Sequence, residues 1–334
     1  MESSASILLK RIVQMEDQVV DMEDVRDVIR NKGIPGDEDA VRMALWSMLL
    51  SVSPLQPSQW SKQKRRMEQD YRKFCEDFIA KPESSFINDA ADHPLSTHLD
   101  SSWKKHFEDK EMQEQINRDV ERTQTDLVFF SGDYRGMKHR EKMSRALFIY
   151  YKLNPGIRYV QGMNEIFAVI YFVFAAEVGN DAVKDVVGDP EVSAFFGFLD
   201  LMGEFRDNFC DKLDRSIVGI AGTMGRITSL IRRTDPVLSE HLEGKLQISP
   251  HLYAIRWVTA LFTQEFVLPD VIILWDRMLS EKSKIDFVVR VSASMVLLEA
   301  RRLLQSDFAS AMKMLQHYPS ADISKIIHYS DNLQ

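Results

Sequence analysis

Hydrophobic positions recur at helical spacing along most of this chain. Apolar residues three or four positions apart occur in residues 1–30, after a turn at 31–39, in 60–79, and from Trp103 towards the end. This period is that of amphipathic helices, and the alternating pattern typical of strands is almost absent. The pattern predicts an all-α fold with a dozen or more helices and no significant sheet.

Residues 1–30 show the pattern in a helix or two. The apolar positions that we expect to form the buried face are Ile7, Leu8, Ile12 and Val13. Prolines end most of the later periodic segments, as residues that cannot continue a helix should. The breaks occur at Pro155-Gly156, Asp189-Pro190, Asp235-Pro236, Ser249-Pro250 and Leu268-Pro269.

Two stretches depart from the amphipathic pattern. Residues 82–102 are polar and rich in serine, which predicts a long loop. Residues 166–176 form the longest apolar run, of eleven residues. A membrane-spanning helix needs about 20 residues, so this run predicts a buried core helix, and we expect any membrane contact to come through partners.

Composition narrows the possible functions. The chain has 334 residues, 45% of them hydrophobic, and a net charge of −8. A general nucleic-acid binder needs a basic surface, so we expect no nucleic-acid partner. The cysteines Cys75 and Cys210 form no CxxC pair, which argues against a disulfide or metal site and is typical of a reducing cytosol.

Known nucleotide and catalytic motifs are missing. The chain contains no GxxxxGK[ST], GxGxxG, HExxH or GxSxG sequence. The stretch GIAGTMG, residues 219–225, has three glycines without a preceding strand or a lysine, and we interpret it as helix packing or a loop. We therefore expect no metal and no cofactor of the chain's own.

An arginine in the segment 114–130 is predicted to point outward. On a helix this segment places four residues on one face, which we expect to be buried: Ile116, Val120, Thr123 and Leu127. Arg122 lies about 120° from Ile116 around the helix axis, and Asp119 precedes it by three residues, within reach of an ion pair. These residues by themselves fit an ordinary surface ion pair as well as a functional arginine.

A glutamine at the start of the apolar helix leaves a similar choice. Gln161 stands where the loop after Gly156 leads into the apolar run, and Gly162 follows it. Glycine allows close backbone approach or an unusual dihedral angle. Gln161 is then either a working side chain mounted on a rigid helix or a cap of its own helix.

Together these segments resemble the TBC domain family, the GTPase-activating proteins of Rab GTPases. Three short motifs and one long one carry the resemblance. The motif IxxDxxR is matched by Ile116, Asp119 and Arg122, followed by Thr123; YxQGM by Tyr159, Gln161, Gly162 and Met163; RxxxW by Arg42 and Trp46; and the late signature by residues 256–279. The sequence is most similar to the branch of the thirteenth human member. Two positions depart from the family pattern, Lys32 in place of arginine and Gln124 in place of proline.

The resemblance implies a function and roles for these residues. A GTP-bound Rab GTPase would be the partner and would itself hold GTP and Mg²⁺. Arg122 would be an arginine finger and Gln161 a glutamine finger, so that the chain activates the hydrolysis without substrate turnover of its own. Asp119 would position Arg122, and Tyr159 would support the glutamine loop. Gly162 would keep the backbone slim at the docked partner.

The remaining motif residues would hold the fold. The resemblance assigns this structural role to Ile116, Thr123, Arg42 and Trp46, and leaves Met163 either in the core or at the rim of the site. Two other functions stay open: a catalytically silent Rab-binding scaffold on the same fold, and a helical scaffold with an unrelated partner.

The resemblance also implies an organisation. Residues 1–30 would pack on a TBC domain of residues 31–330, whose N-terminal lobe, about 31–180, carries both fingers and whose C-terminal lobe is about 181–330. We expect a cytoplasmic monomer that is recruited peripherally to endomembranes.

Overall fold

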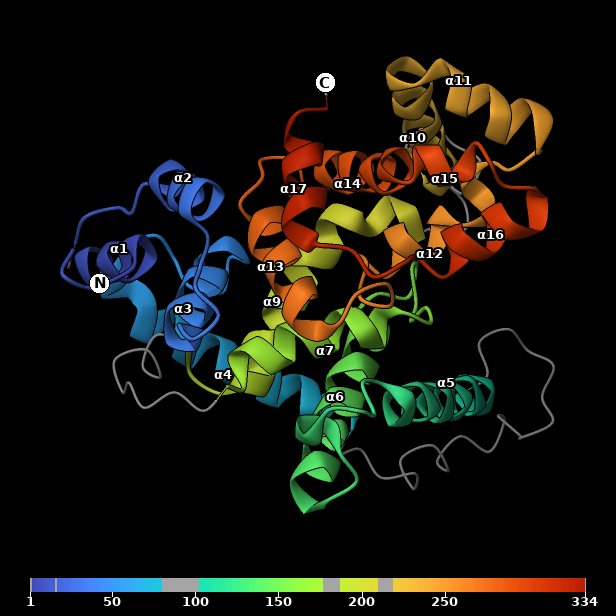
Figure 1. Cartoon of the computed structure of the whole chain (residues 1–334). Helices are drawn as coiled ribbons and strands as arrows, with labels where there is room; N and C mark the ends of the chain where they lie inside the picture. Colours follow the sequence, from blue (N-terminus) through green and yellow to red (C-terminus); the bar gives the residue numbers. More distant parts are fainter. Residues whose placement is uncertain (1, 16, 80–101, 177–186, 210–218, 334) are drawn as a thin grey trace.

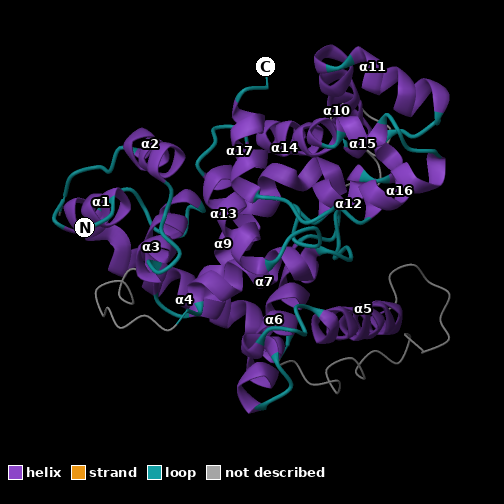
Figure 2. Cartoon of the chain, in the orientation of Figure 1, coloured by secondary structure: helices purple, strands orange, loops and turns teal. Residues whose placement is uncertain are grey.

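The fold is all-α, as the spacing predicts. The computed structural model describes residues 2–15, 17–79, 102–176, 187–209 and 219–333. Every regular element in these ranges is a helix (Figure 2). None of these helices combines the length and the apolar character that a membrane span requires. The loop expected at 82–102 lies almost wholly outside the described residues, and so does the expected lobe boundary near residue 180.

The helices follow one another along the chain with short connections. The first half contains α1 (Ser4–Val13), α2 (Met22–Lys32), α3 (Asp39–Leu49), η1 (Pro57–Gln59), α4 (Trp60–Phe78), α5 (Ser102–Arg122), η3 (Val128–Phe130), α6 (Tyr134–Leu153) and α7 (Met163–Phe174). The second half contains α9 (Pro190–Phe205), η4 (Arg206–Phe209), α10 (Ile220–Thr234), α11 (Pro236–Ser239), the π-helix η6 (Glu240–Lys245), η7 (Pro250–Leu252), α12 (Ala254–Thr259), α13 (Leu268–Leu279), α14 (Lys284–Leu298), α15 (Ala300–Leu303), α16 (Phe308–Gln316) and α17 (Ile323–Asp331).

Helix α7 forms the centre of the molecule. It packs against α3, α5, α6 and α9, so it is covered on most sides (Figure 1). Its apolar side chains are buried nearly all round, as the uninterrupted apolar run predicts. Phe167 meets Phe198 of α9 edge to face, with ring centroids 5.5 Å apart. A residue at the start of α7 is therefore attached to the most rigid part of the fold.

Helix α1 packs against α2 and α3 through a face different from the expected one. Leu8 and Ile12 are buried as predicted, but Ile7 and Val13 are exposed. Ala5 and Leu9 take their places in the core. The four apolar positions chosen from the sequence span too wide an arc for one contact, and the packing against α2 and α3 selects half of them.

Helix α5 is shorter than the sequence pattern suggested. We expected helical geometry to continue from residue 114 to Leu127, but the helix ends at Arg122. The Thr123 hydroxyl donates to the Asp119 carbonyl at 2.9 Å, and Gln124 adopts a left-handed conformation with φ of 46°. A left-handed residue just after a helix is a usual way to end it. Arg122 thereby becomes the last helical residue.

Candidate functional site

The C-terminus of α5 meets the N-terminus of α7 around one buried carboxylate. Asp119 lies on the inner side of α5 and is only 6% exposed. Its Oδ1 accepts a hydrogen bond from Arg122 Nη2 at 3.3 Å, and its Oδ2 accepts one from the Tyr159 hydroxyl at 3.0 Å. One carboxylate thus connects the arginine of α5 to the loop that precedes α7.

Arg122 points away from the core, as the helical wheel predicts. Its side chain is 71% exposed, and its Nε donates to the Arg118 carbonyl at 3.0 Å. Within the described residues its Nη1 has no hydrogen-bond partner. The stem of the side chain is therefore held, while part of the guanidinium stays available to a ligand outside the chain.

Gln161 is exposed directly before α7. The first helical residue is Met163, and the capping position belongs to Gly162, without a side-chain cap. The Gln161 side chain makes no hydrogen bond or ion pair to any described residue. The geometry therefore does not support the alternative in which Gln161 caps its own helix.

Gly162 is required by its backbone conformation. Its φ is 106°, a value that residues with a Cβ rarely adopt. A Cβ here would lie 3.9 Å from the Thr259 carbonyl oxygen, an ordinary contact, so the dihedral angle and not the space demands glycine. This turn directs the Gln161 side chain off the axis of α7.

Asn164 joins the two elements and was missed by the sequence reasoning. Its Oδ1 accepts from the Gly162 N–H at 3.0 Å, and its Nδ2 donates to the Thr123 hydroxyl at 2.8 Å. The Tyr159 hydroxyl also lies 3.2 Å from its Oδ1. An asparagine in the first turn of an otherwise apolar helix was the only signal of this role, because a buried amide needs partners.

Glu165 and Gln124 form a second link between the same elements. Gln124 Nε2 donates to Glu165 Oε2 at 3.2 Å. Burial raises the pKa of Glu165, and the hydrogen bond from Gln124 opposes this. The residue that departs from the expected proline therefore ties the end of α5 to α7.

Tyr159 remains a hydrogen-bond donor in this environment. Burial, followed by the negative charge of Asp119, raises the pKa of its hydroxyl. A neutral hydroxyl beside a carboxylate donates its proton to the carboxylate oxygen. Tyr159 thus holds the Asp119 carboxylate and, two residues further along, the start of the Gln161 turn.

The other predicted motif residues lie in the core. Ile116 and Met163 are both fully buried, and of the two places that the sequence left open for Met163 the structure shows the core. Arg42 and Trp46 belong to a different network: Trp46 Nε1 donates to Asp276 Oδ1 at 2.7 Å, and Arg42 Nε contacts both carboxylate oxygens at 3.2 Å.

The structure therefore brings six of the predicted residues together and leaves four outside their hydrogen-bond network. The six are Asp119, Arg122, Thr123, Tyr159, Gln161 and Gly162. In the part of the chain that the structure describes, no group of three or more histidine, cysteine or acidic side chains is placed to hold a metal ion.

Comparison with known proteins decides the family. The model of the Rab-GTPase-TBC domain matches residues 39–304, which is most of the chain. The chain belongs to this family. The match lies inside the range 31–330 expected from the motifs. Membership supports a Rab GTPase-activating function and a Rab GTPase as partner.

Relatives extend the TBC match over the whole chain. The chain is 30% identical to TBC1 domain family member 13 of Homo sapiens, over 99% of both chains. It is 28% identical to human TBC1 domain family member 5 over 87% of this chain but only 41% of that protein. These matches confirm the branch that the sequence resembled.

A solved structure supports the same fold. The crystal structure of the Ypt/Rab-GAP domain of Gyp1p superposes with a TM-score of 0.75 and 21% identity, over 98% of this chain and 97% of that one. At this identity the likeness confirms the helical TBC architecture alone.

Proposed function

We propose that this TBC protein accelerates GTP hydrolysis by a Rab GTPase, with Arg122 as arginine finger and Gln161 as glutamine finger. The observation that carries the proposal is the Asp119–Tyr159 hydrogen bond. It ties the helix end that bears Arg122 to the turn that bears Gln161, and both side chains are exposed. Two polar groups held on one rigid network can act on the same external phosphate.

The arginine suits the charge that hydrolysis creates. Negative charge grows on the phosphoryl oxygens in the transition state, and a guanidinium offers several donors to it. Arginine fingers of other GTPase systems contribute about 10³–10⁵ in rate, or roughly 4–7 kcal/mol of barrier. Because Asp119 engages one Nη atom at 3.3 Å, the pair orients Arg122 without consuming its other donors.

The glutamine supplies the second part of the reaction. An amide can accept a hydrogen bond from the attacking water and donate one to a phosphate oxygen. Gln161 would take this role on a GTP and Mg²⁺ that are held by the partner. The left-handed turn at Gly162 and the buried helix behind it keep the side chain in one place.

Single-turnover hydrolysis of GTP-loaded Rab proteins tests the proposal. Arg122→Ala should lower the stimulated rate by about 10³-fold or more, and Gln161→Ala should also lower it by orders of magnitude. Both residues are exposed, so thermal unfolding should stay unchanged. Arg118→Ala, an exposed arginine one turn earlier in α5, is the matched control and should keep full stimulation.

Two results would contradict the assignment. Wild-type stimulation by both variants would remove the fingers from the mechanism. Binding of GTP-loaded Rab without any acceleration by the wild type would instead favour the silent scaffold.

A further inference from the structure

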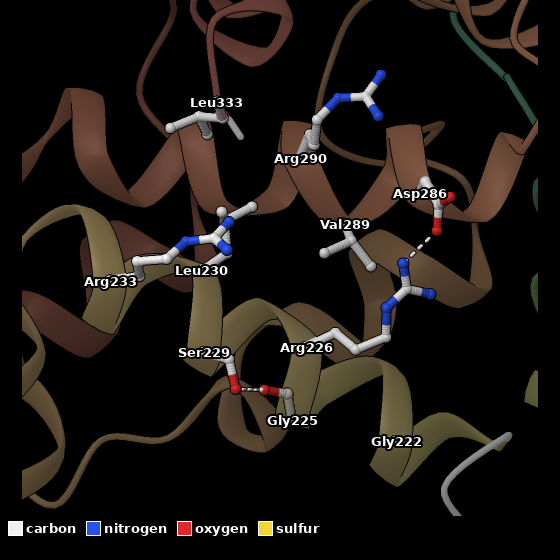
Figure 3. Close-up of a pocket in the computed structure, with 10 residues that line it drawn as sticks. All are labelled: Gly222, Gly225, Arg226, Ser229, Leu230, Arg233, Asp286, Val289, Arg290 and Leu333. Atoms are coloured by element: carbon white, nitrogen blue, oxygen red, sulfur yellow. Dashed lines mark hydrogen bonds and ion pairs between the residues drawn. The ribbon is translucent and has the colours of Figure 1, made fainter.

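A groove on the surface lies between α10 and α14. It encloses about 840 Å³ and is lined by residues of both helices and by Leu333 near the C-terminus (Figure 3). In Figure 1 these helices lie at the end of the molecule opposite α5. The groove is therefore separate from the candidate site of Arg122 and Gln161.

The wall formed by α10 is unusually smooth. Gly222, Gly225 and Ser229 line the groove at positions i, i+3 and i+7, which share one side of a helix. A Cβ on Gly225 would meet no atom within 4 Å. The glycine-rich stretch is thus helical, and at Gly225 it leaves open space instead of making a tight contact within the chain.

The rim of the groove carries excess positive charge. Arg226 pairs with Asp286, and Arg290 lies 3.4 Å from Glu281 and over the Phe287 ring. Arg233 makes no ion pair with any described residue. Three guanidinium groups face one carboxylate on the lining, in a chain whose net charge is −8. The groove is thus complementary to a negatively charged ligand.

The distribution of these groups favours an elongated ligand. Arg226 and Arg233 are seven residues apart, about 10 Å along the helix axis, so a single phosphate cannot contact both. The three apolar residues of the lining are Leu230, Val289 and Leu333, and all are buried. Side chains recessed in this way cannot insert into a bilayer, but they can receive apolar side chains from a ligand.

We propose that the groove binds an acidic amphipathic helix of a partner protein. Apolar side chains of that helix would contact the recessed floor, and its carboxylates would pair with the arginines on the rim. The small residues of α10 would let the two helix backbones approach closely. This is the helix-in-groove mode of peptide recognition, with charge complementarity selecting an acidic sequence.

Fluorescence anisotropy with a designed peptide tests the proposal. The probe is a labelled helical peptide about 15 residues long, with leucine at positions i, i+3, i+4 and i+7 and glutamate on the flanks. The control probe carries glutamine in place of each glutamate. We expect the full chain to bind the acidic probe more tightly than the neutral one, and added salt to weaken that binding.

Two variants locate the contact. Arg233→Glu should raise the Kd about tenfold or more, which corresponds to ~1.4 kcal/mol. Arg301→Glu makes the same change at an exposed arginine of α15 outside the groove and should leave the Kd unchanged. Gly225→Leu fills the groove at a helical position with free space, so the fold should persist while binding is lost.

The outcomes separate this proposal from others. No binding of the acidic probe, equal binding of both probes, or equal loss in Arg233→Glu and Arg301→Glu would each overturn it. Arg233-dependent binding to phosphatidylserine vesicles without binding of the probe would overturn it in favour of a membrane. Stimulation of GTP hydrolysis by Arg233→Glu should equal that of the wild type, which makes the result independent of the finger assignment.

Discussion

At the scale of single residues, burial separates the arginines of the fold from the arginine of the candidate site. Arg145 makes two contacts of 2.6 Å to the buried Glu191, and Arg42 is itself buried. Such side chains are committed to the core. Arg122 has the same chemistry, but it is exposed and keeps donors without partners among the described residues. Its position on the helix, rather than its type, makes it available to another molecule.

Glu165 should make stability depend on pH near the site. Burial raises its pKa, so the folded protein holds the proton to a higher pH than the unfolded chain does. The free energy of unfolding contributed by this group is thus largest below the ordinary value of 4.5 and is lost as the pH rises through the raised pKa.

Glu165→Gln removes this titration while it keeps an acceptor for Gln124. We expect the stability of the wild type relative to the variant to fall with increasing pH across that window. Urea unfolding of both proteins at a series of pH values measures this difference. A difference that is constant, or that increases with pH, would show that the folded-state pKa of Glu165 is not raised.

At the scale of elements, two helix ends form the candidate site. α5 stops at Arg122, where Thr123 and Gln124 leave helical geometry, and α7 starts after the left-handed Gly162. Helix ends expose backbone groups that need partners, and here side chains of the opposite element supply some of them. The Gly162 N–H donates to Asn164, whose amide in turn donates to Thr123 beyond the end of α5.

Tyr159→Phe tests whether this joint positions the finger. Loss of the hydroxyl leaves Asp119 without one donor, so we expect the free energy of unfolding to fall by about 1–3 kcal/mol. We also expect kcat of the stimulated reaction to fall while KM for the Rab changes little, because the docking surface stays intact. Tyr134→Phe, at an exposed tyrosine, is the control for both measurements. An unchanged kcat would mean that Asp119 holds Arg122 without help from Tyr159.

At the scale of the whole molecule, a buried ion pair closes the chain across 234 positions. Asp276 of α13 accepts from Arg42 and Trp46 of α3, and Arg42 also donates to the Ile34 carbonyl at 3.0 Å. Trp46 and Trp275 stack beside it, with ring centroids 6.0 Å apart. This network joins an N-terminal helix to a C-terminal one and contains neither proposed finger.

Asp276→Ala should therefore destabilise the fold more than it affects the site. It leaves a buried guanidinium without its counter-ion, and we expect a loss of about 3–5 kcal/mol in the free energy of unfolding. Chemical denaturation at neutral pH measures this loss. At a temperature where the variant stays folded, its stimulation of GTP hydrolysis should match that of the wild type. A loss below about 1 kcal/mol would show that the pair is not important for stability.

The elements could be predicted because helical periodicity is a local property. The apolar run of α7 indicated a helix buried on most sides, and the wheel of α5 placed Arg122 outward, both as observed. The boundaries were harder: α1 buries Leu9 in place of Ile7, and α5 stops before Leu127. These details depend on which neighbours pack against each helix, and no spacing rule contains that information.

The sequence by itself determined the all-α class, the family motifs and the outward direction of Arg122. Only the tertiary structure decided that Asp119 would contact Tyr159 and that Asn164 would join both elements, 45 positions from Asp119 along the chain. Helical patterns follow from neighbours three and four residues apart, so they can be read along the chain. Contacts between distant helix ends exist only once the core has packed, because the path of the backbone through that core brings them together.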